Sequence, residues 1–292
     1  MKDKFVFITG AATGIGLATS KKFASMGWQV ISTVLPGQDK SGLTNIANIQ
    51  IVELDITKAN MVEEMAKKVH DIVGDEGLAL LINNAGIANI GSGALEGVGM
   101  TDIKFCYEVN VFGTITMIKS FLPLLRRYGT ARIINLASGA VRAPVPFAGA
   151  YNSSKYSVLG ISKTLRYELA PFGIQVACIE PSTVQSEMTA GHTENMEISW
   201  SKMTPESVRI YRDTIGPTNE WLSEQIVNAI PPEQIADKIY KVHGKKKMKI
   251  RYGGGSMAEM LSVTEGILGE NLFEKILMKM MKVPKNKFIR KV

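Results

Sequence analysis

Short runs of consecutive apolar residues alternate with longer stretches of helical periodicity along most of this chain. The runs are continuous rather than alternating with polar residues, which is typical of strands buried on both faces of a parallel sheet. Strands and helices in this order form right-handed crossovers. The pattern therefore predicts one α/β domain with a doubly wound parallel sheet over residues 1–292, and strands at Lys4–Thr9, Gln29–Val34, Ile49–Leu54, Ala79–Asn83, Arg132–Ala137 and Ile174–Glu180.

The helical stretches lie between these strands and set the expected organisation of the chain. After Glu180 the regular alternation ends, and residues 185–230 are expected to be a long irregular segment. Such segments in compact enzymes often form lids or binding loops, so we predict a substrate lid here. The predicted helices are Gly16–Met26, Ala59–Val73, Asp102–Arg127 and Ala150–Ala170.

The composition excludes several classes of protein. With 45% hydrophobic and 21% charged residues over 292 positions, the chain can form one large core and is not disordered. Its three histidines are scattered and its two cysteines show no pairing pattern, so we expect no metal site, Ser-His-Asp triad or disulfide. The net charge of +7 is concentrated near the end without interleaved aromatics, which argues against nucleic-acid binding. The first apolar run is too short for a signal peptide or membrane span, so we expect a cytoplasmic protein.

A glycine-rich turn separates the first predicted strand from the first predicted helix, with the sequence Thr9-Gly10-Ala11-Ala12-Thr13-Gly14-Ile15-Gly16. In such a turn, backbone N–H groups approach a pyrophosphate at the positive end of the helix. A side chain at Gly10 or Gly14 would obstruct this approach, and Gly16 would allow the helix and the strand to pack closely. The turn and its flanking elements together predict a nucleotide-binding site.

Tyr151 and Lys155 stand four residues apart in the sequence Tyr-Asn-Ser-Ser-Lys, within a predicted helix. Residues at this spacing lie on the same helical face. A phenol with a pKa near 10 is a poor base at neutral pH, but a nearby ammonium group and the positive charge of an oxidised nicotinamide favour the phenolate. The pair is therefore a candidate acid/base for hydride chemistry, although the five residues alone could arise by chance.

The order and spacing of these motifs resemble those of the short-chain dehydrogenase/reductase family. The Thr-Gly-x-x-x-Gly-Ile-Gly turn matches the family motif residue for residue, and Asn-Asn-Ala-Gly at 83–86 ends the fourth strand. The resemblance covers about residues 4–190 and implies a Rossmann-type fold and an NAD(P)(H)-dependent oxidoreductase that interconverts an alcohol and a carbonyl. One departure is Pro181-Ser182, where the family often has Pro-Gly, and this alters the expected geometry of that turn.

The resemblance also implies roles for single residues. Tyr151 would act as acid/base, and Lys155 would lower its pKa and hold the nicotinamide ribose. Ser138 would bond the substrate oxygen, and Asn110 would position a water of a proton relay beyond Lys155. The residues implied to contact the cofactor are Gly10, Thr13, Gly14, Ile15, Gly16, Val34, Leu35, Asp55, Ile56, Asn83, Ala85, Gly86, Tyr151, Lys155, Pro181, Thr183 and Val184.

The end of the second strand bears on the choice between NAD and NADP, because an acidic residue there favours NAD and an arginine favours NADP. Val34 occupies this position, and Asp39 and Lys40 nearby could act in either direction. The run Ser-Thr-Val-Leu at 32–35 resembles retinol dehydrogenases, 11-beta-hydroxysteroid dehydrogenase type 2 and D-3-hydroxybutyrate dehydrogenase. That branch largely uses NAD, so we expect NAD, with NADP as the alternative.

The substrate is less well defined by the sequence. An apolar lid suits a lipophilic alcohol or ketone such as a retinoid or steroid, and residues 185–230 contain Trp200, Met203, Tyr211 and Trp221. A small hydroxy acid is the alternative, and it would need a basic anchor such as Arg142, Arg209 or Arg212. A non-catalytic nucleotide-sensing or scaffold protein of the same fold is a further alternative.

Residues 266–292 form a basic tail with an apolar stripe at helical spacing. We expect this amphipathic helix to dock on the enzyme body or on a second subunit. Its alternative partner is an anionic membrane surface, which would suit a lipophilic substrate. We also expect a homodimer or homotetramer. The stripe consists of Leu268, Leu272, Phe273, Ile276, Leu277, Met280 and Met281.

Overall fold

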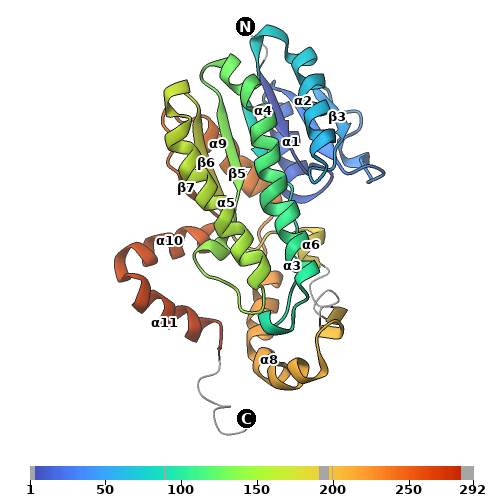
Figure 1. Cartoon of the computed structure of the whole chain (residues 1–292). Helices are drawn as coiled ribbons and strands as arrows, with labels where there is room; N and C mark the ends of the chain where they lie inside the picture. The colour runs from blue at the N-terminus through green and yellow to red at the C-terminus, as the bar shows by residue number, and fades with distance from the viewer. Residues whose placement is uncertain (1–3, 89, 191–196, 199, 284–292) are drawn as a thin grey trace.

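The computed structural model describes residues 4–88, 90–190, 197–198 and 200–283, without the side chains of residues 188 and 212–217. One sheet of seven parallel strands has the order β3-β2-β1-β4-β5-β6-β7. The chain starts near the middle of the sheet, winds outwards to β3, and then crosses back to build the other half, which is the predicted doubly wound α/β fold (Figure 1). The strands are β1 Phe5–Ile8, β2 Gln29–Val34, β3 Ile49–Glu53, β4 Leu80–Asn83, β5 Arg132–Leu136, β6 Gln175–Pro181 and β7 Arg251–Gly254.

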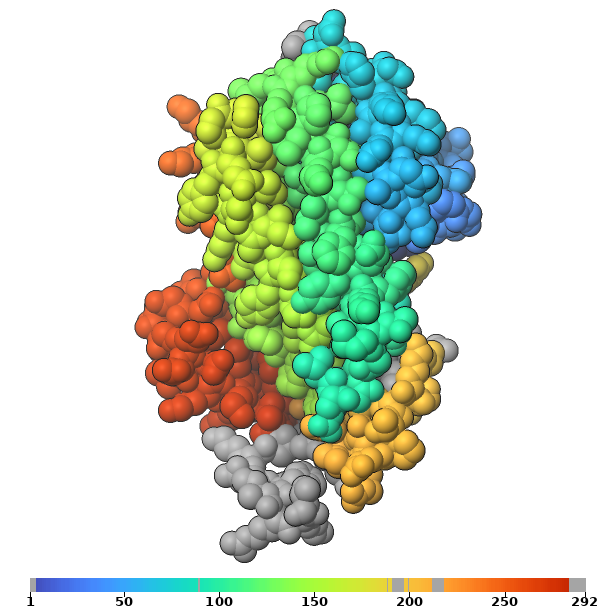
Figure 2. All heavy atoms as spheres, in the orientation of Figure 1, coloured from blue at the N-terminus to red at the C-terminus, as the bar shows by residue number. Residues whose placement is uncertain are grey.

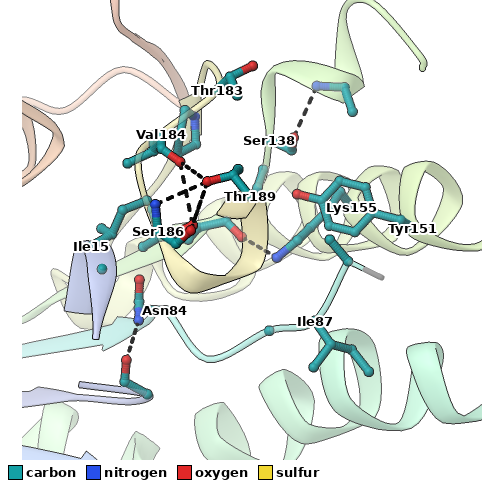
Figure 3. A pocket seen from close by; sticks show the side chains of 18 of the residues that line it. Ile15, Asn84, Ile87, Ser138, Tyr151, Lys155, Thr183, Val184, Ser186 and Thr189 are labelled. Carbon is teal, nitrogen blue, oxygen red and sulfur yellow. Dashed lines mark hydrogen bonds between the residues drawn. The ribbon is translucent and has the colours of Figure 1, made fainter. Parts of the chain in front are cut away.

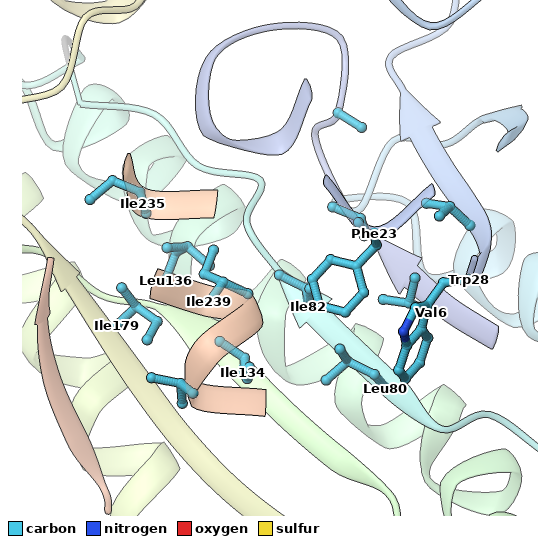
Figure 4. Close-up of a cluster of buried hydrophobic side chains, with 14 of the residues drawn as sticks. Val6, Phe23, Trp28, Leu80, Ile82, Ile134, Leu136, Ile179, Ile235 and Ile239 are labelled. Carbon is cyan, nitrogen blue, oxygen red and sulfur yellow. The ribbon is translucent and has the colours of Figure 1, made fainter. Parts of the chain in front are cut away.

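Helices cover both faces of the sheet, so each face has its own apolar core. On one face α1 and α9 pack together, and Phe23 and Ile239 meet Ile82 and Ile134 of the strands (Figure 4). On the other face α2, α4 and α5 lie over a second cluster around Phe7 and Phe121. These helices are α1 Gly14–Ser25, α2 Ala59–Val73, α4 Thr114–Tyr128, α5 Gly149–Glu168 and α9 Pro232–His243.

The six predicted strands are all confirmed within a residue or two at each end, but the seventh strand was not predicted. Strand β7 contains Gly253 and Gly254, which carry no apolar side chain and so give no strand signal. There is no room for a side chain at either glycine. A Cβ at Gly253 would lie 2.9 Å from the backbone nitrogen of Glu259, and one at Gly254 would lie 3.0 Å from Cα of Pro181. The edge strand is thus defined by long-range packing rather than by local pattern.

The long helix predicted at Asp102–Arg127 is wrong as a single regular element. It consists of α3 (Met100–Tyr107) and α4, separated by a π-helical turn at Glu108–Gly113. The turn has a packing constraint at Gly113, where a Cβ would lie 2.8 Å from the Ile56 side chain. Such π-turns are often found at functional sites, and this one carries Asn110.

The irregular segment predicted at 185–230 is also wrong, since most of its described part is helical. It contains α6 (Glu187–Ala190) and the long helix α8 (Pro205–Val227). Thr204 caps α8 by accepting a hydrogen bond from the Ser207 backbone, and Pro205 occupies the first turn. Thr-Pro-Glu is a usable helix-start signal.

The described part of the tail, which ends at Val283, belongs to a pair of helices whose inner face docks on the body, as in one of the two alternatives; residues 284–292 lie outside the described residues. This C-terminal helix pair consists of α10 (Ser256–Leu268) and α11 (Glu270–Met280). Phe273 and Leu277 of α11 are buried in a cluster with Trp221 of α8 and Leu261 of α10. In Figure 2 the pair forms a ridge beside the lower part of the molecule. Within the described ranges, no helix has the length and apolar character needed to cross a membrane.

Candidate active site

The glycine-rich turn lies between β1 and α1 and forms one end of a large cavity. Gly10 has φ +65°, and a Cβ there would lie 2.9 Å from Cα of Ala85. Asn84 braces the turn by donating from Nδ2 to the carbonyl oxygens of Thr9 and Gly10, both at 2.9 Å. Helix α1 begins at Gly14, so its unpaired N–H groups lie where Gly14 and Ile15 line the cavity. The turn therefore has the free donors and the open space that a pyrophosphate requires.

The cavity has a volume of about 830 Å³ and extends from this turn past Tyr151 to the C-terminal helix pair. Most of the predicted site residues line it. Three do not: Gly16, Asn83 and Asn110. Gly16 instead lets α1 approach the turn, because a Cβ there would lie 2.2 Å from the carbonyl oxygen of Gly10. The side chain of Asn83 donates to Oδ1 of Asn135 at 2.8 Å inside the sheet.

The end of β2 forms the wall where an adenosine ribose would lie. Val34 is buried and Leu35 is exposed, and the Leu35 amide donates to the Gln38 side chain. Lys40 pairs with Glu53 at 3.4 Å, while Asp39 accepts two hydrogen bonds from Ser41. Asp39 and Lys40, whose effect on the cofactor choice the sequence left open, thus both interact with neighbouring side chains.

Tyr151 and Lys155 occupy the same side of α5 and point into the middle of the cavity (Figure 3). The Lys155 ammonium lies 5.8 Å from the centroid of the Tyr151 ring and donates to the carbonyl oxygen of Leu136 at 3.0 Å. Burial lowers the pKa of Lys155 to about 8. The helical spacing therefore produces the predicted proximity, within a buried environment that disfavours the charged lysine.

The pKa of Tyr151 in the protein alone is raised above that of a free phenol. Burial raises the pKa of this phenol, and a hydrogen bond with Ser138 acts in the opposite direction. Lys155 and an oxidised nicotinamide were expected to lower it together. In the protein alone the Lys155 ammonium is directed at the Leu136 carbonyl oxygen, and desolvation of the phenol dominates. The protein by itself therefore favours the neutral, proton-donating form of Tyr151.

Ser138 follows β5 and begins a short 3₁₀ turn, Gly139–Val141. Its Oγ accepts a hydrogen bond from the Ala140 amide at 3.1 Å and lines the cavity beside Tyr151. A Cβ on Gly139 would lie 3.0 Å from the carbonyl oxygen of Pro181, so this loop is pressed against the end of β6. The loop thereby holds the serine hydroxyl within reach of the phenol.

Asn110 lies behind Tyr151 and Lys155 rather than in the cavity. Its Oδ1 accepts from the Ile87 amide at 2.8 Å, and its Nδ2 donates to the Ile87 carbonyl oxygen and to Ser154 Oγ, both at 2.9 Å. A Cβ at Gly86 would lie 3.0 Å from Asn110 Oδ1 and 3.1 Å from Lys155 Nζ. The sequence reasoning did not identify Ser154 as a partner of Asn110, although its place directly before Lys155 was a usable signal.

The turn after β6 is well braced despite its serine. The Ser182 amide donates to the carbonyl oxygen of Gly254 at 2.8 Å, and the Thr183 carbonyl accepts from the Ile230 amide at 3.0 Å. Strand β7 and the chain after α8 therefore fix the geometry that the Pro-Ser departure left open. Pro181, Thr183 and Val184 all line the cavity.

The far end of the cavity is apolar and comes from three helices. None of the three proposed basic anchors is placed there by the structure. Arg142 pairs with Glu180 and Glu265, Arg209 pairs with Glu206 on the surface, and the side chain of Arg212 lies outside the described residues. Lys58 and Lys155 are the basic residues among the described cavity lining. The apolar wall consists of Trp221, Leu222, Met257, Leu261 and Met280.

Comparison with known proteins agrees with this geometry. The short chain dehydrogenase family model matches residues 4–197. The uncharacterized oxidoreductase YusZ of Bacillus subtilis is 30% identical over 96% of this chain and 99% of its own length. Human 17-beta-hydroxysteroid dehydrogenase type 2 is 37% identical over 61% of this chain, which spans 47% of that protein. A Burkholderia cenocepacia short chain dehydrogenase solved with NADP has a TM-score of 0.70 at 23% identity, covering 97% of this chain and 99% of its own, and this supports the fold.

Three lines of observation now converge: the glycine-rich cradle, the Ser138–Tyr151–Lys155 cluster and a family match covering more than half of the chain. The predicted resemblance to this family is confirmed, with relatives named as steroid and retinol dehydrogenases. The chain belongs to the short-chain dehydrogenase family of oxidoreductases.

Proposed function

We propose that this enzyme interconverts an alcohol and a carbonyl with a nicotinamide cofactor, and that Tyr151 is the acid/base. The observation that carries this proposal is the position of Tyr151. It lies between the glycine-rich cradle and the apolar chamber, beside Ser138 and Lys155. A hydroxyl group held at this point would meet a proton acceptor and a hydrogen-bond donor together.

The cavity fits a dinucleotide along its length. The backbone at Gly14 and Ile15 would hold the pyrophosphate, and Asp55, whose carboxylate is oriented by Thr57, would face the adenine. Lys155 would hold the nicotinamide ribose, and the turn at Thr183 would meet the carboxamide. A bound nicotinamide supplies the hydride acceptor or donor.

The proton in this reaction would move through the residues of the chain. In alcohol oxidation, the substrate hydroxyl would give its proton to the Tyr151 oxygen while Ser138 bonds the same substrate oxygen. Because burial raises the pKa of Tyr151, a positive charge nearby is needed to stabilise the phenolate. Lys155, which is charged below its pKa of about 8, would supply that charge together with an oxidised nicotinamide.

NAD is the cofactor that the wall at β2 favours. A 2′-phosphate would need a basic partner, and Lys40 is already paired with Glu53. Val34 and Leu35 supply no charge of either sign. Steady-state kinetics with both cofactors test this preference, and a kcat/KM for NADP above that for NAD would contradict it.

A lipophilic alcohol or ketone of retinoid or steroid size is the substrate class we propose. The wall formed by Trp221, Leu261 and Met280 offers apolar surface, and the human relative is named for a hydroxysteroid. A small hydroxy acid is a weaker candidate, because Arg142, the proposed anchor next to the chamber, is engaged by two carboxylates.

The decisive experiment compares Tyr151→Phe with the wild type on retinoids, steroids and short hydroxy acids. The variant keeps the ring and loses the hydroxyl, so kcat/KM should fall by about 10²–10⁴-fold while cofactor binding remains. Equal rates in the two proteins would overturn the catalytic assignment. Cofactor binding without turnover on any substrate would favour a non-catalytic, nucleotide-sensing role.

We propose further that the outer face of the C-terminal helix pair contacts an anionic membrane surface. Its apolar side chains Val263, Ile267 and Ile276 are exposed, and basic residues outnumber acidic ones after Gly269. In flotation, vesicles containing phosphatidylserine should bind the wild type and should not bind the double variant Ile267→Asp/Ile276→Asp. Equal flotation would contradict the proposal, and a change of oligomeric state in the variant would instead assign this face to the expected homo-oligomer.

A further inference from the structure

The loop from Ser138 to Ala143 connects the catalytic centre to the wall of the apolar chamber within six residues. It is rigid, because the Val141 amide donates to the Ser138 carbonyl oxygen at 3.1 Å and the Ala143 amide donates to that of Gly139 at 3.1 Å. At its far end, Ala143 is buried in the same cluster as Leu261 of α10 and Leu277 of α11. One short segment thus contacts the phenol at one end and the C-terminal helix pair at the other.

Arg142 supplies the polar link within this segment. Its Nε donates to Glu180 at 2.6 Å, and its Nη1 donates to Glu265 of α10 at 2.6 Å. Glu180 is fully buried in β6 and is also bonded by Arg251 of β7, which reaches the Val141 carbonyl oxygen at 3.4 Å. The two carboxylates and two guanidinium groups balance in charge, so the arrangement satisfies its buried members.

The inner side of α10 explains what this link would control. Met257 and Leu261 of α10 and Met280 of α11 line the cavity, so the position of α10 sets the width of the apolar chamber. Among the described ion pairs, Glu265 is the one that joins α10 to the loop carrying Ser138. The other, between Glu259 and Lys238, joins α10 to α9 on the outside. The two ends of α10 are therefore held by chemically similar but separate contacts.

We infer that Arg142 is a positioning residue that fixes the C-terminal helix pair relative to the catalytic loop. Through Glu265 it holds the apolar wall at a set distance from Ser138, so that a long apolar substrate presents its oxygen to Tyr151. The inference rests on the proposed function only for its kinetic consequence, because the mechanical link is defined by the contacts alone.

The link is tested by hydrogen exchange on two matched variants of the full chain. Glu265→Gln removes the carboxylate that reaches Arg142, and Glu259→Gln makes the same change on the same helix at the Lys238 pair. In Glu265→Gln, amides at 139–143 and at 256–268 should both exchange at least about fivefold faster. In Glu259→Gln, the amides at 139–143 should keep wild-type rates. Equal behaviour of the loop in the two variants would overturn the inference.

Kinetics show whether the link acts on the substrate. Glu265→Gln should raise KM for a long lipophilic alcohol by about fivefold or more, with little change for a short alcohol or for the cofactor. Arg142→Lys cannot bridge both carboxylates with one planar group and should have the larger effect. Equal losses for long and short alcohols would show a merely structural ion pair and reject the positioning role. If the wild type oxidises neither alcohol, the proposed function fails, while the exchange result still decides the link.

Discussion

Gly10 and Gly27 share a left-handed backbone but differ in their surroundings. Gly10 has φ +65° and a built Cβ would meet Cα of Ala85 at 2.9 Å, whereas Gly27 has φ +79° and nothing within 4 Å. Conformation and close approach can therefore be separated by making the same substitution at each. Only at Gly10 does the backbone of a second strand end press against the turn that would hold the phosphates.

Replacing each glycine by alanine should separate the two effects. Gly27→Ala should lose about 1–2 kcal/mol of unfolding free energy, the cost of a left-handed conformation, and keep cofactor affinity. Gly10→Ala should lose more and bind the dinucleotide at least about tenfold more weakly, because the turn must shift. Urea unfolding and fluorescence titration measure both. Unchanged affinity in Gly10→Ala would contradict the assignment of this turn to the cofactor.

Lys155 makes stability depend on pH in an unusual direction. Its folded pKa is lowered from 10.5 to about 8, so between these values the unfolded chain binds more protons than the folded one. Stability from this group therefore rises as pH increases from about 8 to 10.5, and the cost of burying the charged form is greatest below pH 8. A methionine at this position would avoid that cost.

Lys155→Met should consequently raise Tm relative to the wild type more at pH 7 than at pH 10. One kcal/mol shifts Tm by roughly 2–4 °C in a large domain, so a difference of several degrees is expected. Calorimetry on both proteins at the two pH values measures it. The variant should also lose activity, and a Tm difference that is independent of pH would show that the lysine is not buried as described.

At the residue scale, the sequence identified Ser138, Tyr151 and Lys155 because family spacing is local information. It could not give the pKa of Tyr151 in the protein alone, since that pKa is raised by burial, which depends on the whole fold. It also offered Arg142 as a substrate anchor, because its partners Glu180 and Glu265 are distant in the chain. The roles of the predicted residues in catalysis stay predictions.

At the scale of elements, the π-turn between α3 and α4 is held against α5 through one serine. Ser154 is fully buried, accepts from Asn110 at 2.9 Å and donates to the Tyr151 carbonyl oxygen at 2.7 Å. Its neighbour Ser153 is exposed and only donates back along its own helix. The two serines are adjacent on α5 and differ in whether they join it to another element.

Alanine at each serine tests the joint between the elements. Ser154→Ala should lose about 1–3 kcal/mol, since a buried amide hydrogen is left unsatisfied, and should lower kcat by loosening Asn110 behind Lys155. Ser153→Ala should stay within about 0.5 kcal/mol of the wild type with unchanged kcat. Chemical unfolding and steady-state rates provide both numbers, and equal effects of the two substitutions would contradict the joint.

Elements were predictable where their signal is local. Strands β1 to β6 follow from continuous apolar runs, because both faces of a parallel strand are buried. Strand β7 was not predicted because its glycines are required by close contacts with Glu259 and Pro181, which are not visible in the local sequence. Helix α8 was not predicted because turn-forming residues within it obscure its helical periodicity. The π-turn could not be predicted from periodicity, because it involves the contact of Asn110 with Ile87, which is distant in the sequence.

At the scale of the whole molecule, the doubly wound topology was predictable because strand order follows from handedness and helix alternation. The arrangement of the C-terminal helix pair was not. Its apolar stripe is split between an inner side, with Phe273 and Leu277 buried, and an outer side, with Leu272 and Ile276 exposed. A stripe in a sequence does not tell which of its residues meet the body, since this depends on where α8 presents Trp221.

The return of the chain through β7 has a consequence for how such a protein can diverge. The cradle, the phenol and the serine loop are complete before β6 ends, while much of the chamber wall comes from segments after it. The paired residues of the sheet end at Gly254, so substitutions beyond this point remove no strand from the sheet. Copies that arise by gene duplication could therefore come to bind ligands of different sizes through changes after Gly254 that keep the contact of Glu265 with Arg142.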